Sequence, residues 1–366
     1  MKLSIQRELL LRPLQTVSNV IERRQTLPVL SNVLMSLRNN TLTLTGTDLE
    51  VEMVAQVVMD SSEEGEITLP ARKFLDICRA LPEDAVINIE VDNTKARIRS
   101  GRSRFSLSTL PASDYPNIDP ITSPFEFTIV QSVLKRLIEQ TQFSMAQQDV
   151  RYYLNGLMFE FSPGKLSGVA TDGHRLAICQ TTADTQIEDN RQVIIPRKGI
   201  LELVRLLEDT DSEIKVYLGI NHMRMDLPDV SFTTKLIDGK FPDYQQVIPK
   251  NPTKVVTSDR IGLLQSLSRA SVLSNEKYRG MRLQLVPGLL KATIHNPEQE
   301  EAEEELEVDY QGEEFEIGFN VSYFIDVLSV IPGEKVELHF TDSNHSCLIN
   351  ATGDTDCQYV IMPMRL

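Results

Sequence analysis

The sequence repeats the stretch GTDLEVEM, residues 46–53, as ATDGHRLAI at residues 170–178, and a third polar pair follows at residues 295–296. The three pairs are Thr47-Asp48, Thr171-Asp172 and His295-Asn296. Their second residues are spaced 124 positions apart. This period far exceeds the roughly 20–50 residues of solenoid repeats, so each copy is long enough to fold around its own core. Prolines near residues 116–124 and 249–252 indicate linkers. The chain therefore divides into three predicted domains, 1–124, 125–253 and 254–366.

Two helix-forming runs flank the repeated stretch in each copy. Apolar spacing predicts first helices over residues 5–21, 129–143 and 261–273, and second helices over 70–81, 196–207 and 320–331. Alternating apolar residues between them, as in 49–57, predict strands. Because the second helix begins about half a period after the first, each domain is expected to be a doubled unit. We predict an α+β fold with helices packed on one side of antiparallel sheets.

The composition is that of a soluble globular protein, with 41% hydrophobic and 24% charged residues. The N-terminal MKLSIQRELL lacks the apolar core of a signal peptide, and no run approaches the roughly 18 apolar residues of a membrane span. The four cysteines form no CxxC pair and are expected to be reduced thiols rather than disulfides. These features predict a cytoplasmic protein with no membrane, metal or cofactor requirement.

The net charge of −15 is distributed unevenly along the chain. Residues 254–366 hold 19 acidic and 9 basic residues, whereas the first two copies are nearly balanced. The third copy contains the acidic run PEQEEAEEELE, residues 297–307, and the first contains the basic run RIRSGRSRFSLSTL, residues 97–110. The acidic run is either a solvated loop or one half of an interface. Opposite charges in the two terminal copies favour head-to-tail pairing of two chains, which closes a ring if the rotation fits.

The second helices carry basic residues seven positions apart, Arg72 with Arg79 and Lys198 with Arg205. Each pair shares one helix face, which suits contact with nucleic-acid phosphates. The alternative is ordinary surface ion pairing, because an acidic residue follows Arg72 and Lys198 at the fourth position. The third copy has no basic residue in its second helix.

Two segments suggest a site in the second and third copies. Asp172 and His174 are compatible with a general-base pair, but the first copy lacks the histidine, and no serine elbow, Walker loop or metal-spaced cluster accompanies them. A polar rim around a pocket is the better interpretation. The C-terminal YVIMPMRL, residues 359–366, completes a strand and then presents adaptable methionines, which favours a peptide-binding role.

Several motifs carry a family likeness: TGTDLE (45–50), PARKF (70–74), QDVRYYLNG (148–156), TDGHRLA (171–177), PRKG (196–199), LSNEK (273–277) and the terminal MPMRL (362–366). With them, the whole chain resembles the bacterial DNA polymerase III beta subunit, the sliding clamp. The resemblance implies three DNA-clamp domains, with helices on the inner face and sheets outside. It also implies a head-to-tail homodimeric ring around duplex DNA that tethers the polymerase, confers processivity in DNA replication and has no catalytic activity.

The resemblance also assigns residues to three surfaces. It implies a dimer interface of Lys73, Arg102, Arg104, Phe105, Leu107, Val272, Leu273, Glu298, Glu300, Glu301 and Glu304. It implies sequence-independent DNA contacts by Arg24, Arg79, Gln148, Tyr152, Tyr153, Arg197, Lys198, Arg205 and Arg282. It implies a partner-peptide cleft formed by Leu154, Thr171, Gly173, His174, Arg175, Leu176, Pro242, Val247, Asn320, Tyr323, Ser346, Val360, Met362, Pro363, Met364, Arg365 and Leu366.

The partners implied are a clamp loader, the replicative polymerase alpha subunit and other proteins with a clamp-binding motif. Gln246 departs from the family pattern, in which the cleft carries an arginine at this place, and is expected to weaken ion pairing with an acidic peptide. Two rival hypotheses are compatible with the sequence. One is a hydrolase that uses Asp172 and His174, and the other is a protein-only scaffold that never contacts nucleic acid.

Overall fold

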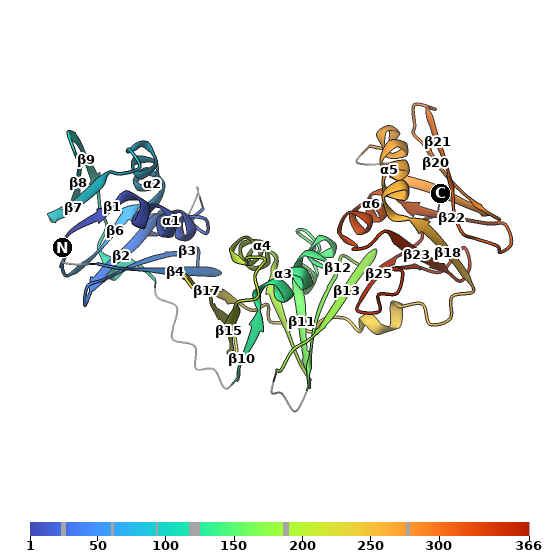
Figure 1. Ribbon diagram of the computed structural model, residues 1–366, viewed down its shortest axis with the longest axis horizontal. Coiled ribbons are helices and arrows are strands. Elements are labelled where there is room, and N and C mark those ends of the chain that lie inside the picture. Colours follow the sequence, from blue (N-terminus) through green and yellow to red (C-terminus); the bar gives the residue numbers. More distant parts are fainter. Residues whose placement is uncertain are drawn as a thin grey trace. The chain divides into compact units, whose positions relative to one another are not determined.

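The computed structural model describes residues 1–22, 27–59, 62–92, 94–116, 125–185, 190–275 and 279–365. Within these stretches one pattern recurs, in which a strand and a helix are followed by a three-stranded antiparallel meander (Figure 1). None of the helices in these stretches is long and apolar enough to cross a membrane.

The first repeat contains this pattern twice. Its first half-unit comprises β1 (Lys2–Gln6), α1 (Arg7–Ser18), β2 (Asn32–Arg38), β3 (Thr41–Thr47) and β4 (Val51–Val58). After the short β5 (Ser62–Glu63), the second half-unit comprises β6 (Gly65–Pro70), α2 (Ala71–Ala80), β7 (Val86–Asp92), β8 (Lys95–Ser100) and β9 (Ser103–Ser108). The predicted doubled unit is therefore confirmed in this repeat.

The second and third repeats follow the same order. The second comprises β10 (Phe125–Val130), α3 (Gln131–Glu139), β11 (Gly156–Ser162), β12 (Lys165–Thr171), β13 (Arg175–Thr182), β14 (Arg191–Pro196), α4 (Arg197–Leu206), β15 (Glu213–Leu218), β16 (His222–Asp226) and β17 (Val230–Lys235). The third comprises β18 (Lys254–Asp259), α5 (Arg260–Ala270), β19 (Gly280–Val286), β20 (Leu289–His295), β21 (Glu301–Glu307), β22 (Phe315–Asn320), α6 (Val321–Val330), β23 (Lys335–Phe340), β24 (Cys347–Ala351) and β25 (Cys357–Ile361).

Short 3-10 turns connect these elements: η1 (Pro28–Ser31), η2 (Ala112–Asp114), η3 (Gln142–Ser144), η4 (Tyr152–Leu154), η5 (Tyr244–Val247) and η6 (Ser271–Leu273). The second helices lie within one residue of their predicted ends. The first helices are shorter than predicted, because Ile5 and Ile129 belong to the preceding strands β1 and β10. A continuous apolar run does not distinguish the end of a strand from the start of a helix.

The two half-units of a repeat exchange their first strands. β1 of the first half-unit pairs with β7 of the second, and β6 of the second pairs with β2 of the first. Each meander is therefore extended by the first strand of the other half-unit. The helices α1 and α2 contact each other over the resulting sheets, as do α5 and α6 in the third repeat (Figure 1). This exchange explains why the half-units do not separate into independent small domains.

Each eight-stranded sheet joins meanders from two different repeats. One has the order β10-β15-β16-β17-β4-β3-β2-β6, and the other has the order β14-β11-β12-β13-β25-β24-β23-β18. Their joining contacts are the antiparallel pairs β17·β4 and β13·β25. The two remaining sheets, β5-β1-β7-β8-β9 and β21-β20-β19-β22, have no such partner and end at β9 and β21.

The chain packs as two compact units, residues 1–131 with 201–236 and residues 132–200 with 237–366. Each eight-stranded sheet lies inside one unit. The core of the second unit contains Phe319, Phe324 and Phe340, whose side chains are fully buried and in ring contact. The two units differ from the three repeats because each unit keeps one eight-stranded sheet whole. The predicted boundaries at 124 and 253 instead follow the sequence repeat.

The first residue of each first helix holds the end of the second helix of the same repeat. Arg7 donates to the carbonyl oxygen of Cys78 at 2.8 Å, and Arg260 donates to that of Leu328 at 2.9 Å. In the second repeat, the side-chain oxygen of Gln131 accepts the N–H of Glu208 at 3.1 Å. The two arginines satisfy carbonyl oxygens that helix C-terminal ends leave unpaired, and Gln131 binds an N–H just beyond the end of α4. The arginines at these two positions are therefore structural.

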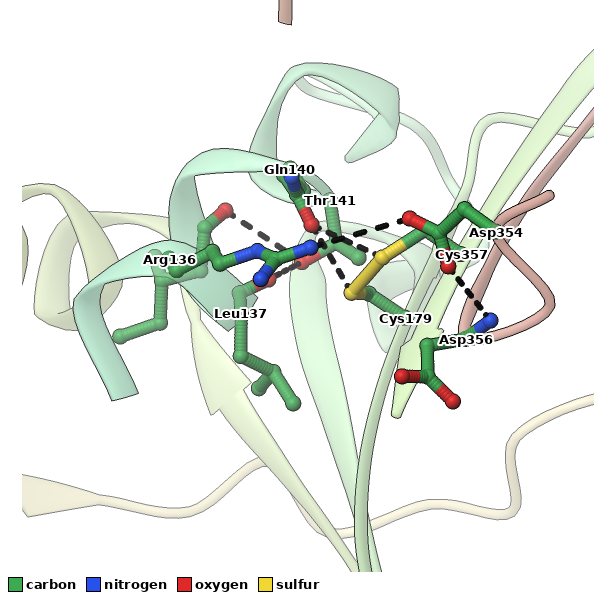
Figure 2. Close-up of a disulfide and its surroundings, with 9 residues drawn as sticks. Arg136, Leu137, Gln140, Thr141, Cys179, Asp354, Asp356 and Cys357 are labelled. Atoms are coloured by element: carbon green, nitrogen blue, oxygen red, sulfur yellow. Dashed lines mark hydrogen bonds and ion pairs between the residues drawn. A yellow bond between two sulfur atoms is a disulfide. The ribbon is translucent and has the colours of Figure 1, made fainter. Parts of the chain in front are cut away.

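The expectation that all four cysteines are reduced thiols is wrong for one pair. Cys179 and Cys357 form a disulfide (Figure 2). Cys78 and Cys347 are free and buried. The two bonded residues are separated by 178 positions and meet because β13 pairs with β25. Cysteine spacing alone contains no information about such a long-range strand pairing.

Candidate functional sites

The repeated Thr-Asp pair builds a tight turn rather than a catalytic dyad. The Asp172 carboxylate accepts the backbone N–H groups of His174 and Arg175, at 2.9 and 3.0 Å. Asp48 makes the equivalent two bonds in the first repeat, at 2.9 and 2.8 Å. Among the described residues, no hydrogen bond joins Asp172 to the imidazole of His174. Both aspartates therefore serve to shape the chain, and general-base chemistry has no support here.

Arg175 extends from this turn to the third repeat. Its guanidinium donates to Asp172 at 3.0 Å and to the carbonyl oxygen of Phe143 at 2.7 Å, and it forms a short ion pair with Asp326 of α6. Its central carbon also lies 4.6 Å from the ring centroid of Tyr323. Three acceptors and one aromatic ring thus hold this guanidinium, and only 12% of the Arg175 side chain is exposed.

Replacing Arg175 with alanine is expected to lower the free energy of unfolding by about 2–3 kcal/mol, because it leaves polar partners of a mostly buried charge unsatisfied. Urea unfolding of the two proteins measures the difference. Asp326→Asn is the milder comparison, since Asp326 is 43% exposed and solvent compensates its loss. An equal loss in both variants would contradict the view that Arg175 is the centre of the network.

A pocket of about 170 Å³ lies beside this network, inside the second compact unit. Its apolar part combines the neighbouring strands β13 and β25 with the segment around η5. The residues that line it are Arg151, Tyr153, Leu154, Thr171, Gly173, Arg175, Leu176, Pro242, Asp243, Tyr244, Val247, Val360 and Met362. A concave, mainly apolar pocket with a few polar groups at its rim suits a small set of anchoring side chains.

The structure brings together nine of the predicted cleft residues in this pocket: Leu154, Thr171, Gly173, Arg175, Leu176, Pro242, Val247, Val360 and Met362. Others lie outside its lining but close to it in the chain. The carbonyl of His174 accepts the N–H of Met362 at 2.9 Å, and the carbonyl of Gly318 accepts that of Met364 at 2.8 Å, which holds the C-terminal segment. Asn320 caps α6, and Leu366 lies outside the described residues.

Three lining residues were not predicted, Arg151, Asp243 and Tyr244, and a fourth, Tyr153, was predicted to contact DNA instead. All four lie within two residues of predicted residues in the chain, in QDVRYYLNG and the FPDY segment. Nothing in the sequence alone shows which of several adjacent side chains turns toward a pocket. Ser346, Pro363 and Arg365 are described but do not line it.

One side of the rim is fixed by Arg151. Its guanidinium forms an ion pair with Asp149 at 2.8 Å and donates to the carbonyl oxygen of Asp172 at 3.3 Å. It also packs so closely on Gly173 that a Cβ there would lie 2.9 Å from it, and Gly173 has a φ of +90°. Glycine is therefore favoured at this position by its backbone conformation, whereas the end of the flexible Arg151 side chain could shift to make room. The hydrogen bond from Arg151 lowers the pKa of Asp149 to about 2.

Replacing Arg151 with glutamine is expected to raise the pKa of Asp149 toward its ordinary value of 3.8. Because the pKa is lowered in the native protein, the contact is complete above about pH 4 and is lost only as the pH falls through about 2. A carboxyl-carbon NMR titration of both proteins tests this. An unchanged pKa would show that the backbone N–H of residue 151, at 2.8 Å, sets the value instead.

The opposite side of the rim carries Asp243 and Tyr244. The amide of Gln246 donates to Asp243 at 2.7 Å, and the Tyr244 hydroxyl donates to Glu160 at 2.6 Å. Burial raises the pKa of Tyr244 well above its usual range, and the bond to Glu160 adds to this. Gln246 is thus a neutral hydrogen-bond partner for Asp243 at the rim.

The predicted basic and acidic segments form two edge strands, β9 and β21, of the two smaller sheets. On β9, Arg104 lies directly opposite Arg99 of β8, an arrangement of like charges that disfavours an isolated sheet. Phe105 and Leu107 of the same strand are only half-buried, and Arg102 occupies the hairpin turn. Lys73 is exposed on α2. This edge therefore combines unpaired backbone groups, apolar surface and positive charge.

The other edge, β21, carries negative charge. Glu301, Glu303, Glu305 and Glu307 alternate along its exposed face, while Glu304 points inward and forms a salt bridge with Arg269 at 2.5 Å. Beside it in η6, Val272 is 77% exposed and Leu273 is half-buried. Glu298 and Glu300 lie in the exposed turn before the strand. Its features are complementary in charge to those of β9.

The predicted DNA contacts fall into separate groups. The backbone N–H of Arg197 donates to the carbonyl oxygen of Asn155, and the side chain of Asn155 accepts the N–H of Asp149. These bonds place Arg197 near the segment that contains Gln148 and the exposed Tyr152. Arg205 on α4 forms a 2.6 Å salt bridge with Glu202, while Lys198 is half-buried on the same helix. Arg79 is exposed at the end of α2.

Arg282 does not belong with these helix residues. It lies on β19 between the buried Met281 and Leu283, so alternation turns it to the sheet face opposite the helices, where it pairs with Glu316 at 3.4 Å. Arg24 lies outside the described residues. Within the described residues there is also no group of three or more metal-ligating side chains placed to hold an ion.

Six half-units arranged as three repeats, with oppositely charged free edges at β9 and β21, define a clamp-like scaffold rather than an enzyme. Comparison with known families gives the particular assignment. The chain belongs to the DNA polymerase III beta subunit family, whose N-terminal, central and C-terminal domain models match residues 1–119, 128–243 and 245–365. The protein is therefore a non-catalytic processivity subunit that tethers a polymerase to DNA, which confirms the predicted fold class and function.

Individual relatives agree with this assignment. The chain is 56% identical to the beta sliding clamp of Pseudomonas putida over 367 residues, with 100% of both chains covered. It superimposes on the crystal structure of the DNA polymerase III subunit beta from Pseudomonas aeruginosa with a TM-score of 0.98 and 56% identity over all of both chains. A P. aeruginosa sliding clamp bound to griselimycin matches equally completely, with a TM-score of 0.96 and 56% identity.

Proposed function

We propose that two copies of this chain close into a ring by pairing β9 of one protomer with β21 of the other. The strand order supports this proposal. The six meanders end at β4, β9, β13, β17, β21 and β25. Four of these last strands pair with the last strand of another meander, as β4·β17 and β13·β25. Of these six described strands, only β9 and β21 do not pair with the last strand of another meander. A second copy, head to tail, supplies both missing contacts.

Charge and apolar surface support the same pairing. The carboxylates of Glu301, Glu303 and Glu305 complement Arg99 and Arg104, whose mutual repulsion an acidic partner relieves. Val272 and Leu273 beside one edge match Phe105 and Leu107 on the other. The predicted interface also contains Lys73, Arg102, Glu298, Glu300 and Glu304.

The ring is proposed to hold duplex DNA without reading its sequence. Arg79, Arg197, Lys198 and Arg205 supply positive charge from α2 and α4, with Gln148, Tyr152 and Tyr153 nearby in the second repeat. At least one of these charges, Arg205, is already paired with a carboxylate, so phosphate binding is weakened. Weak contacts allow sliding, while ring closure provides retention. The helix α6 contains no basic residue and adds little to DNA contact.

The pocket is proposed to receive short peptides from DNA-processing partners. A P. aeruginosa sliding clamp binds griselimycin, and this chain matches that clamp over its full length. The apolar lining around Leu176, Val247 and Met362 fits two or three apolar anchors. The partners proposed are the replicative polymerase alpha subunit, the clamp loader and other proteins with a clamp-binding motif, all of them in the cytoplasm with the chromosome.

Loading the protein with a clamp loader onto nicked circular DNA tests the ring directly. After gel filtration, the clamp is expected to stay with the circle and to be lost when a restriction enzyme linearises the DNA. Retention that depends only on salt, and is equal on circular and linear DNA, would contradict encirclement. No retention on either form would favour a scaffold that does not contact nucleic acid.

A further inference from the structure

We propose that Cys179 and Cys357 form a reversible thiol–disulfide couple that fastens β13 to β25 beneath the peptide pocket. The two residues lie directly opposite each other in the antiparallel ladder, with their Cα atoms 4.1 Å apart. The N–H of Gln180 donates to the carbonyl oxygen of Asp356, so the pair next to the cysteines is hydrogen-bonded. Because the two kinds of pair alternate along an antiparallel ladder, Cys179 and Cys357 form a non-hydrogen-bonded pair. Side chains approach most closely at such positions, so the pairing itself brings the sulfurs together.

The surroundings of the pair also accommodate the reduced form. The side-chain oxygen of Gln140, on the segment after α3, lies 3.0 Å from Sγ of Cys179 and 2.8 Å from Sγ of Cys357 (Figure 2). A thiol donates its proton to such an oxygen, whereas a disulfide has no proton to donate. Gln140 is itself buried, so it is a ready acceptor for both thiols. The site therefore has a satisfactory arrangement for either oxidation state.

Oxidation at this pair is favoured over oxidation at the other cysteines. Burial raises the pKa of Cys78 to about 12 and that of Cys347 well above its usual range, so both remain unreactive thiols. Neither has a second sulfur within bonding distance in the described structure. Only the Cys179–Cys357 pair combines two sulfurs in contact with a shared acceptor.

A small reagent has a short route to the buried pair. Cys357 is the first residue of β25, and the preceding turn, residues 352–356, is largely exposed. An ion pair of 3.7 Å between Arg136 of α3 and Asp354 holds this turn against the helix (Figure 2). Transient opening at a strand end requires little disruption of the core. Fraying of the turn thus exposes the sulfurs while the rest of the sheet stays intact.

The couple is connected to the pocket through the same two strands. Leu176 and Val360, which line the pocket, face each other three pairs along the ladder from the two cysteines. A covalent bond across β13 and β25 restricts their relative motion and holds the pocket side chains in their binding arrangement. This consequence rests on the proposed peptide-binding function, whereas the couple itself does not.

The chemistry balances with a peroxide as oxidant. The two thiols release two protons and two electrons as the S–S bond forms, and hydrogen peroxide accepts them to become two water molecules. A dithiol reductant such as dithiothreitol returns two electrons and two protons by thiol–disulfide exchange and is itself oxidised to a cyclic disulfide. In a reducing compartment the two cysteines are thiols at rest, and the disulfide forms when an oxidant is present.

Thiol counting in the full-length protein tests the couple. Native protein is treated with hydrogen peroxide or dithiothreitol, freed of reagent, denatured and alkylated with N-ethylmaleimide for mass spectrometry. Two adducts are expected after peroxide and four after dithiothreitol, with a linked Cys179–Cys357 peptide in the non-reducing digest. Four adducts after peroxide would refute the bond. Two adducts after native treatment with dithiothreitol would refute its reversibility.

Matched variants separate the couple from general oxidation. Cys347→Ala removes a buried cysteine on the adjacent strand and is expected to keep the redox response, whereas Cys357→Ala abolishes it. Gln140→Leu removes the thiol acceptor, so a larger oxidised fraction is expected at a fixed ratio of reduced to oxidised glutathione. An unchanged fraction in this variant would refute the role assigned to Gln140.

Peptide affinity tests the connection to the pocket. The oxidised protein is expected to bind a fluorescent peptide with two apolar anchors about three- to tenfold more tightly than the reduced protein, and Cys357→Ala is expected to bind equally after either treatment. Equal affinity of the two wild-type forms would refute the coupling. Failure of both forms to bind would refute the peptide site itself, while the thiol count would still decide the couple.

Discussion

Ser106→Pro on β9 is expected to convert the dimer into monomers and to abolish retention on circular DNA. The N–H of Thr109 donates to Thr94 at 3.0 Å, and hydrogen-bonded pairs alternate along an antiparallel ladder. Ser106, opposite Arg97, is therefore a non-hydrogen-bonded position whose N–H faces the free edge. Proline removes that donor and places its ring where the partner strand approaches.

The dissociation constant is expected to rise about 100-fold, which corresponds to about 2.8 kcal/mol. Sedimentation equilibrium across a range of protein concentrations measures it. Folding should be spared, because proline is tolerated at the outward positions of an edge strand. Circular dichroism and thermal unfolding of the monomer check this point.

Ser106→Ala is the matched control for that variant. It removes the same hydroxyl but keeps the backbone N–H, so the dimer is expected to persist. A Ser106→Pro protein that remains dimeric would show that β9 is not the strand that meets the second copy. The basic and acidic edges would then need another explanation, such as solvation alone.

Val247→Asp in η5 is expected to weaken binding of a partner peptide by at least 100-fold. Val247 lines the apolar pocket with Leu176 and Met362, so a carboxylate there removes apolar contact and must be dehydrated when an anchor enters. The combined loss is about 3 kcal/mol or more. Fluorescence anisotropy with a labelled peptide measures it, and competition by griselimycin provides a second readout.

Val58→Asp is the control for this substitution. It makes the same chemical change at a valine that is 82% exposed at the end of β4, in the other compact unit. Peptide affinity is expected to stay within about twofold of the wild type. If Val247→Asp binds normally while its fold is intact, the pocket beside η5 is not the peptide site. Dimerisation should be unaffected by either change.

Much of the scaffold was predictable because it depends on local patterns. Apolar spacing located the second helices to within one residue, and the 124-residue interval of Asp48 and Asp172 identified equivalent turns before their hydrogen bonds were known. The charge contrast between the runs at 97–110 and 297–307 identified the two segments that prove to be free sheet edges. Turns, helices and edge charges are encoded within a few neighbouring residues.

The pocket was predictable only in part. The family resemblance named nine of the residues that line it, whereas it did not name Arg151 and named Tyr153 as a DNA contact. The resemblance also named Arg282 as a DNA contact, and alternation along β19 turns this residue to the sheet face opposite the helices. These points concern the direction of a side chain, which depends on the register of an element and on the elements packed against it.

By itself, the sequence determined three similar α+β copies, their repeated turns and the opposite charges of their ends. Only the tertiary structure decided which strands join. The exchange of β1 and β6, the pairing of β13 with β25 and the meeting of Cys179 with Cys357 all link residues far apart in the chain. Backbone hydrogen bonds between strands are nearly independent of side-chain identity, so only the packing of the whole core selects their partners.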